Sequence, residues 1–197
     1  MKIHVINPNS TRSMTAKIAE AARAVAAPGT EIVASNPANT PASIEGYHDE
    51  AVAVPAVMAE VIAGTEAGAD AFVIACFDDA GLEACREVTD RPVLGICEAA
   101  MFAAGLVAAR FSVVTTLPRA IPIIEDLADA YGYTRQCRRV RSAEIPVLAL
   151  EEDGDAEVLA IGEAPGRLLH PLDFGVDPLG DGVGDAMLQV GEDALEV

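Results

Sequence analysis

The strongest constraint on the fold is a regular alternation of short apolar segments with longer amphipathic ones. The apolar segments are rich in β-branched residues, as strands buried on both faces are. Parallel strands covered by helices on both sides of a sheet produce this alternation. We therefore predict an α/β fold built from parallel sheets. The predicted strands are 2–6, 31–34, one that ends at Cys76, 92–96, 111–115 and 145–150, and the predicted helices are 14–25, 49–66, 82–88, 98–109 and 121–131.

Composition narrows the class of function. The 197 residues are enough for one domain or two small lobes. The formal charge of −18 argues against nucleic acid or an anionic membrane surface as a partner, because both would repel the chain. No apolar run is long enough to span a bilayer and none resembles a signal peptide, so we expect a cytoplasmic location. The 4 cysteines show no C-x-x-C spacing, and we expect no metal.

The end of the third predicted strand is the main candidate for chemistry. Cys76 closes that strand, and Asp78 and Asp79 follow where a helix is expected to begin. Open α/β sheets bind ligands at this edge, and helix N–H groups there favour a thiolate, whereas the two carboxylates oppose it. We predict a thiol that titrates in the working pH range. The alternative is a small apolar residue buried at a strand end.

Two strand ends resemble each other. The first strand runs into Asn9 and Ser10, and the strand 111–115 runs into Thr115 and Thr116. One interpretation is that each pair only caps the helix that follows. The alternative is that the two pairs belong to two lobes and donate hydrogen bonds to a ligand in one cleft. The polar loop 36–48 is long enough to be a lid or a binding segment.

The sequence also carries five ordered motifs. They are Ile6-Asn7-Pro8-Asn9-Ser10-Thr11, Ser43-Ile44-Glu45-Gly46-Tyr47-His48-Asp49-Glu50, Ala75-Cys76-Phe77-Asp78-Asp79, Gly95-Ile96-Cys97-Glu98-Ala99-Ala100 and Val113-Val114-Thr115-Thr116-Leu117. Together these motifs resemble the hydantoin racemase family of the aspartate/glutamate racemase superfamily. The resemblance implies two pseudo-symmetric α/β lobes, assembly into homo-oligomers, and inversion without a cofactor of a carbon next to a carbonyl group. In such a reaction a thiolate from one lobe removes a proton, and a thiol from the other lobe returns one on the opposite face.

The resemblance also assigns roles to residues. Cys76 matches the first-lobe thiol. The developing enolate needs hydrogen-bond donors at its oxygen, and the candidates for substrate binding are Asn9, Ser10, Ser43, Thr115 and Thr116. Supporting roles behind the site are expected for Asp78, Asp79 and Glu98. The implied substrate is a small molecule, a 5-substituted hydantoin or a related amino-acid derivative.

The C-terminal part departs from the family pattern. We expect a first lobe from 1–92 plus part of the C-terminal region, an incomplete second lobe over 93–162, and a divergent, turn-rich or poorly ordered tail over 163–197. The family's second thiol lies in a Gly-Cys-Ala-Gly-Met-like turn, which is absent from this sequence. We expect the tail to come from a shifted reading frame or a truncated gene product. The alternative is a genuine C-terminus in which Asp185–Val190 forms a helical turn or two.

The missing thiol leaves three functions open. The first is a racemase, with Cys97 as one alternative source of the second thiol. The second is a single-thiol isomerase or decarboxylase, and the third is a ligand-binding or inactive relative. Of the remaining cysteines, Cys85 is expected to pack within a helix. Cys137 is expected in a solvated basic turn whose cations lower its pKa.

Overall fold

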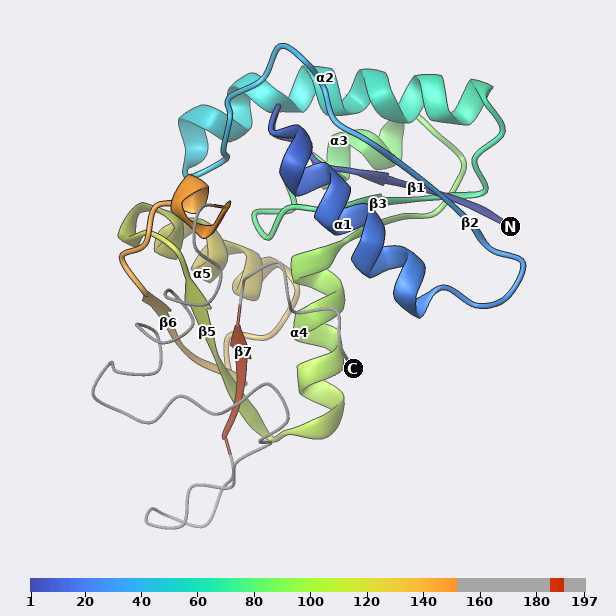
Figure 1. Ribbon diagram of the computed structural model, residues 1–197. Coiled ribbons are helices and arrows are strands. Elements are labelled where there is room, and N and C mark those ends of the chain that lie inside the picture. Colours follow the sequence, from blue (N-terminus) through green and yellow to red (C-terminus); the bar gives the residue numbers. More distant parts are fainter. Residues whose placement is uncertain (152–184, 190–197) are drawn as a thin grey trace. The chain divides into compact units, whose positions relative to one another are not determined.

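The protein divides into two compact units in the computed structural model, which describes residues 1–151 and the strand 185–189 (Figure 1). The first unit is Met1–Ala99, and the second begins at Ala100. The boundary falls within helix α4 (Ile96–Val107).

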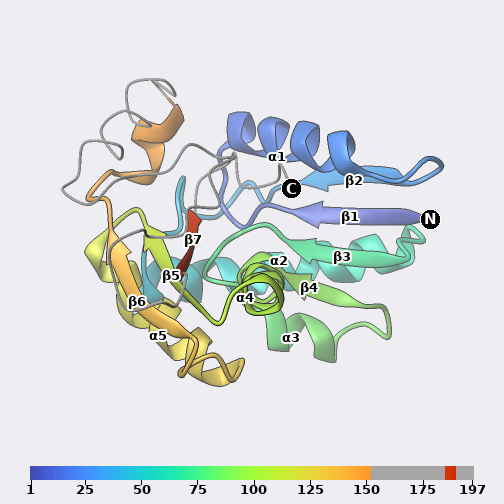
Figure 2. The same cartoon turned by 90° about the horizontal axis from the view of Figure 1, so that it is seen from below.

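A four-stranded parallel sheet forms the centre of the first unit. Its strands are β1 (Lys2–Ile6), β2 (Glu31–Ser35), β3 (Ala71–Ile74) and β4 (Val93–Gly95). They lie side by side in the order β2-β1-β3-β4, as Figure 2 shows. The predicted α/β class with parallel sheets flanked by helices is therefore confirmed.

Helices cover this sheet. They are α1 (Arg12–Val25), α2 (Tyr47–Glu66) and α3 (Leu82–Glu87), and Figure 1 shows α2 and α3 on one side of the strands. The α2 helix buries Ala53, Val57, Val61 and Gly64, which recur at the spacing of one helical face. A Cβ atom at Gly64 would collide with the rings of His4 and Phe72, so glycine allows α2 to approach the sheet closely.

The second unit contains a smaller parallel sheet. Its strands are β5 (Arg110–Thr115), β6 (Cys137–Ser142) and β7 (Asp185–Gln189), in the order β6-β5-β7. A short 3₁₀ turn, η1 (Pro118–Ala120), leads from β5 into α5 (Ile121–Ala130). The α5 helix buries Ile123, Ile124 and Ala128 on one face.

Three predictions of local structure were wrong. Residues 145–150 were predicted as a strand, but Val147–Glu151 is the 3₁₀ turn η2. The expected basic turn around Cys137 is strand β6, and the helical turn suggested for 185–190 is strand β7. Short apolar runs do not distinguish strand from helix by periodicity, and β6 buries only Val140. The rest of the predicted tail lies outside the described residues.

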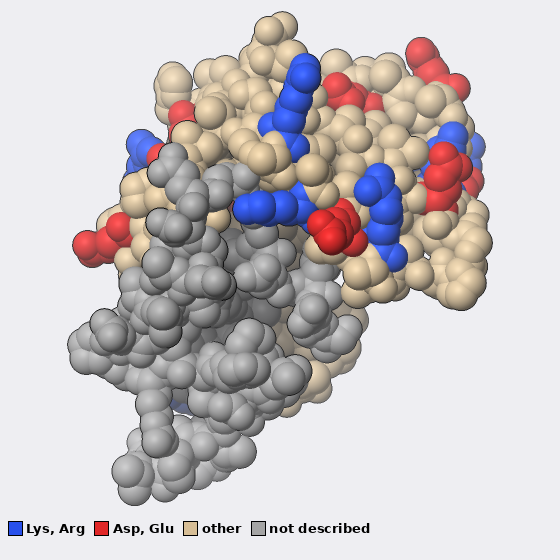
Figure 3. All heavy atoms as spheres, in the orientation of Figure 1, with Lys and Arg blue, Asp and Glu red and all other residues tan. Residues whose placement is uncertain are grey.

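The surface of the first unit carries both signs of charge. On the face seen in Figure 3, Lys and Arg side chains are interspersed with Asp and Glu. None of the helices within residues 1–151 combines the length and apolar character needed to cross a membrane.

Candidate active site

Two chain segments with polar side chains leave the first sheet at the same edge. Because β1 and β3 are parallel neighbours, Ile6 pairs with Ile74 at their carboxyl ends. The Ala75 N–H donates a 2.8 Å hydrogen bond to the Ile6 carbonyl, which extends the pairing by one residue. The turn after β1 and Cys76 after β3 therefore emerge side by side, where parallel α/β sheets hold their ligands.

The turn after β1 is built around two buried asparagines. Asn7 is 1% exposed, and its Nδ2 donates to Asn9 Oδ1 (3.0 Å) and Thr15 Oγ1 (3.1 Å). Asn9 Oδ1 also accepts the Thr11 N–H at 2.9 Å, and Asn9 Nδ2 contacts Met14 Sδ. The Asn9 side chain thus holds the turn in shape. Sequence reasoning did not single out Asn7, although an asparagine directly after a buried strand is a recognisable signal.

The loop 36–48 is tied to this turn. The Pro41 carbonyl accepts hydrogen bonds from the Ser10 backbone N–H (2.9 Å) and the Ser10 hydroxyl (3.3 Å). The Thr11 hydroxyl donates to the Ala42 carbonyl at 2.6 Å. Ser43 lies farther along the loop and donates to Glu45 at 3.1 Å. Ser10 and Ser43 are therefore held in one loop assembly beside the end of β1.

Cys76 lies in a tight turn between β3 and α3. Taken as a whole residue Cys76 is half-buried, and the Asp79 N–H donates to the Cys76 carbonyl at 2.9 Å. Burial raises the pKa of the Cys76 thiol well above its usual value. The charge of Asp78 is the next largest cause, those of Asp79 and Glu50 add to it, and a hydrogen bond from the Asp78 backbone N–H opposes the rise.

This result corrects the expectation of a thiol that titrates in the working range. The effect expected from helix N–H groups is outweighed by burial and by the neighbouring carboxylates, and α3 begins at Leu82, as predicted, six residues after Cys76. Gly81, with φ of 74°, makes the bend that precedes it. In the free protein Cys76 is therefore a thiol at neutral pH.

Asp78 is the most unusual carboxyl group near the thiol. It is 7% exposed, and burial raises its pKa to about 7, with further increases from the charges of Glu50, Asp79 and Asp49. Glu50 lies in the first turn of α2, and burial raises its pKa as well. The carboxyl groups beside Cys76 therefore come from two elements, and sequence reasoning had not included Glu50 among them.

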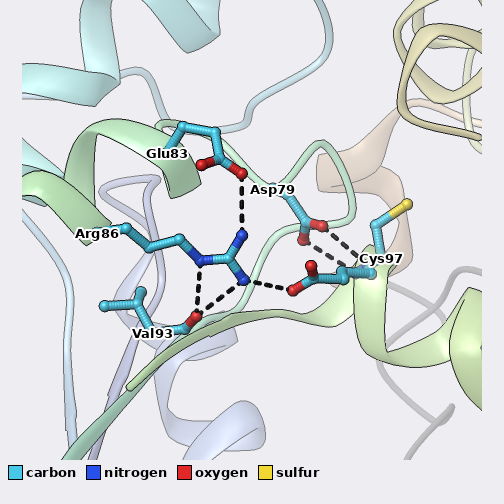
Figure 4. Close-up of polar contacts among 6 residues, drawn as sticks. Asp79, Glu83, Arg86, Val93 and Cys97 are labelled. Carbon is cyan, nitrogen blue, oxygen red and sulfur yellow. Dashed lines mark hydrogen bonds and ion pairs between the residues drawn. The ribbon is translucent and has the colours of Figure 1, made fainter. Parts of the chain in front are cut away.

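Asp79 has a different role, which Figure 4 shows. Its two carboxylate oxygens accept the backbone N–H groups of Cys97 (2.9 Å) and Glu98 (2.8 Å) in the first turn of α4. A carboxylate at this position satisfies two otherwise unpaired helix N–H groups and interacts favourably with the helix dipole. Asp79 thus fixes the turn that carries Cys76 to the start of α4.

Glu98 strengthens the same connection through Arg86. The Arg86 Nη2 atom lies 2.6 Å from Glu98 Oε2, and Arg86 also donates to the Val93 carbonyl and to Glu83 (Figure 4). The guanidinium group thereby joins α3, β4 and α4. Asp79 and Glu98 therefore support the frame of the Cys76 turn.

Replacing Gly95 by Ala is expected to weaken this frame. A Cβ atom at Gly95 would collide with the Asp79 carboxylate, which would have to leave the first turn of α4. We expect a loss of about 1–3 kcal/mol in the free energy of unfolding, measured by denaturant titration. The control is Leu94→Ala in the same strand, because Leu94 is half exposed and should change stability by only about 0.5 kcal/mol. Equal stability of the wild type and Gly95→Ala would show that the Asp79 contact is unimportant.

The second unit holds the other two predicted binding residues. Thr115 is buried at the carboxyl end of β5, and Thr116 follows it and is half-buried. Their backbone carbonyls accept the N–H groups of Ala143 (2.8 Å) and Ile145 (3.1 Å), so the segment after β6 holds this strand end.

The remaining cysteines differ in their placement. Cys85 and Cys97 are fully buried, and burial raises the pKa of Cys85 to about 11. Packing of Cys85 in a helix is thus confirmed. Burial also raises the pKa of Cys137, which corrects the expected lowering by neighbouring cations. Cys137 pairs with Phe111 near the start of β5, at the opposite end of that strand from Thr115.

Comparison with known proteins gives matches along most of the chain. The Asp/Glu/hydantoin racemase family profile matches residues 3–169. A hydantoin racemase of Rhizobium meliloti is 59% identical over 78% of this chain and 64% of its own length. A hydantoin racemase of Pseudomonas sp. (strain NS671) is 50% identical over 80% of this chain and 64% of its own length.

A solved structure agrees with the sequence matches. The allantoin racemase from Klebsiella pneumoniae superposes with a TM-score of 0.80 and 48% identity, covering 83% of this chain and 66% of its own. The matched part therefore spans a little less than two thirds of the length of these relatives.

Proposed function

Because this chain belongs to the Asp/Glu/hydantoin racemase family, we propose that it inverts a carbon next to a carbonyl group in 5-substituted hydantoins or related amino-acid derivatives. The observation that carries the proposal is the position of Cys76. It leaves the sheet beside the Asn7–Ser10 turn, in a chain 59% identical to a hydantoin racemase.

The chemistry requires proton transfer at one carbon. In a hydantoin ring the neighbouring carbonyl acidifies the C–H bond, and removal of the proton places negative charge on the carbonyl oxygen. In our proposal the Cys76 thiolate takes the proton. The proposed donors for the enolate oxygen are hydroxyl groups, those of Ser10, Ser43, Thr115 and Thr116. The Ser10 and Ser43 hydroxyls would have to leave the Pro41 carbonyl and Glu45 in order to donate. Acid–base steps of this kind proceed without a cofactor.

A second candidate is a reaction that uses one thiol and exchanges the proton on one face only. It is favoured by the positions of the cysteines. The chain has 4, and Cys137 is the only one after Ala99. Because Cys137 lies at the start of β6, it does not share a strand end with Thr115 and Thr116. Inversion by these residues would therefore need a second acid other than Cys137, either the buried Cys97 of α4 or a group that is not a thiol.

Exchange in deuterated water separates these candidates. Each enantiomer of a 5-substituted hydantoin is incubated with the protein, and deuterium at the reacting carbon and chirality are followed by mass spectrometry and chiral chromatography. Racemisation predicts exchange with inversion from both enantiomers. Exchange of one enantiomer without inversion would favour the one-thiol reaction. No exchange across a panel of hydantoins would contradict both.

Thr116→Val tests the proposed enolate donors. If the Thr116 hydroxyl contacts the developing negative charge, its removal should lower kcat about 100-fold. Valine keeps the shape of the side chain, so the unfolding midpoint should change little. An unchanged kcat would restrict Thr116 to a structural role at the end of β5.

A further inference from the structure

One oxygen of the Asp78 carboxyl group is buried without a hydrogen-bond partner among the described residues. Asp78 is 7% exposed, and this oxygen is its Oδ2 atom. A negative charge on this oxygen is costly, because no protein donor among the described residues compensates it. This oxygen is therefore suited to take up a proton.

Its neighbour Asp79 cannot serve in the same way. Both oxygens of Asp79 accept backbone N–H groups of α4, and these bonds stabilise the ionised form. The two consecutive aspartates thus differ in function. Asp79 anchors the turn, whereas Asp78 has an oxygen with room for a proton.

The surroundings of Asp78 increase its affinity for a proton. The charged groups that act on it are carboxyl groups, Glu50 and Asp49 from α2 and Asp79 from the turn itself. Together with burial, they raise the pKa of Asp78 to about 7. The Asp78 backbone N–H donates a hydrogen bond to the Cys76 sulfur, and the charge of the Asp78 carboxylate raises the pKa of the Cys76 thiol.

We propose that the Asp78 carboxylate accepts the proton of Cys76, so that the two side chains act as one unit that supplies the thiolate. This inference rests on the proposed function. The S–H bond breaks, its proton forms the O–H bond of Asp78, and the electron pair stays on sulfur as the thiolate. The thiolate then takes the C–H proton of the substrate and leaves an enolate. After a separate acid has protonated the enolate, Asp78 releases its proton to solvent and the separate acid takes one up, so that all three groups are restored.

This route to the thiolate costs less than ionisation of Cys76 beside a charged Asp78, although the pKa of the thiol lies above that of Asp78. A thiolate formed beside an ionised Asp78 would place two anions in one buried site. Transfer of the proton adds no further anion to the site, because the negative charge moves from oxygen to sulfur. Asp78 is thus a positioning residue that acts through Cys76, and its removal should affect the thiol and the reaction in opposite directions.

Asp78→Asn tests the inference in the full-length protein with two measurements. The first is the rate of Cys76 alkylation by iodoacetamide between about pH 6 and pH 10, followed at Cys76 by peptide mass spectrometry. The second is deuterium exchange on a hydantoin. Loss of the neighbouring charge should lower the pH midpoint of alkylation by about one unit or more. Loss of the proton acceptor should nevertheless lower kcat for exchange about 100-fold.

The control is Asp90→Asn, because the Asp90 side chain is 87% exposed and should change neither measurement. An Asp78→Asn protein with unchanged alkylation would overturn the inference. An Asp78→Asn protein whose deuterium exchange is unchanged, or increases with the amount of Cys76 thiolate, would also overturn the inference. Asp78 would then be unnecessary as a proton acceptor. If the wild-type protein exchanges no hydantoin, the proposed function fails. Alkylation then decides the inference, with a lower midpoint supporting it and an unchanged one overturning it.

Discussion

Cys76→Ser is expected to lower exchange at the reacting carbon by about 10³-fold or more for both enantiomers. A serine hydroxyl fills nearly the same half-buried position but ionises far less readily than a thiol. The substrate would still enter, so the loss should appear in kcat. The measurement is deuterium exchange on a 5-substituted hydantoin.

The control for this variant is Cys137→Ser, which changes a half-buried cysteine at the start of β6. Its exchange rate should equal that of the wild type, and both variants should keep the wild-type unfolding midpoint. Substantial exchange by Cys76→Ser would remove the thiol from the proposed reaction.

Asp78→Asn is expected to stabilise the protein at pH 8 and to lose that advantage as the pH falls. In the unfolded chain this carboxyl group ionises near its ordinary pKa, whereas in the folded protein its pKa is about 7. The folded state therefore binds more protons between about pH 4 and pH 7, and wild-type stability falls as the pH rises through this window. Above it the ionised group costs about 4 kcal/mol, which asparagine avoids.

Denaturant titrations of the wild type and Asp78→Asn from about pH 5 to pH 8 measure this difference. The difference in free energy of unfolding between Asp78→Asn and the wild type should increase with rising pH and level off above the pKa of Asp78. Asp90→Asn, changed at an exposed side chain, should show no such trend. A gap that stays constant with pH would show that Asp78 is not the group whose pKa is raised. We thus expect the buried charge of Asp78 to lower the free energy of unfolding of the wild type, a cost that is common for functional residues.

The elements that follow strong periodic patterns were predictable from the sequence. Strand β1 has the predicted bounds 2–6, and α2 begins two residues before its predicted start. Strand β6 was missed because it lies at the edge of its sheet and carries exposed arginines, which are common on edge strands. The pattern of its side chains resembles a basic turn more than a buried strand.

The position of Cys76 at a strand end was predictable from the sequence, whereas the electrostatics around it were less so. The end of an apolar strand identified Cys76, and the sequence also pointed to Asp78 and Asp79. The difference between the two aspartates depends on contacts in the folded protein. Glu50 of α2 acts on Asp78, whereas Asp79 binds the start of α4. Such contacts between distant segments determine whether a carboxyl group is a helix cap or a proton carrier.

The close contact between Gly95 and Asp79 also leads us to expect correlated changes at these two positions during evolution. The two positions share one small volume, so they should covary among homologous sequences. A larger residue at 95 should be accompanied by a shorter one at 79, and such a homologue would need a different group to cap the helix that follows. Sequences that keep aspartate at 79 should keep glycine at 95.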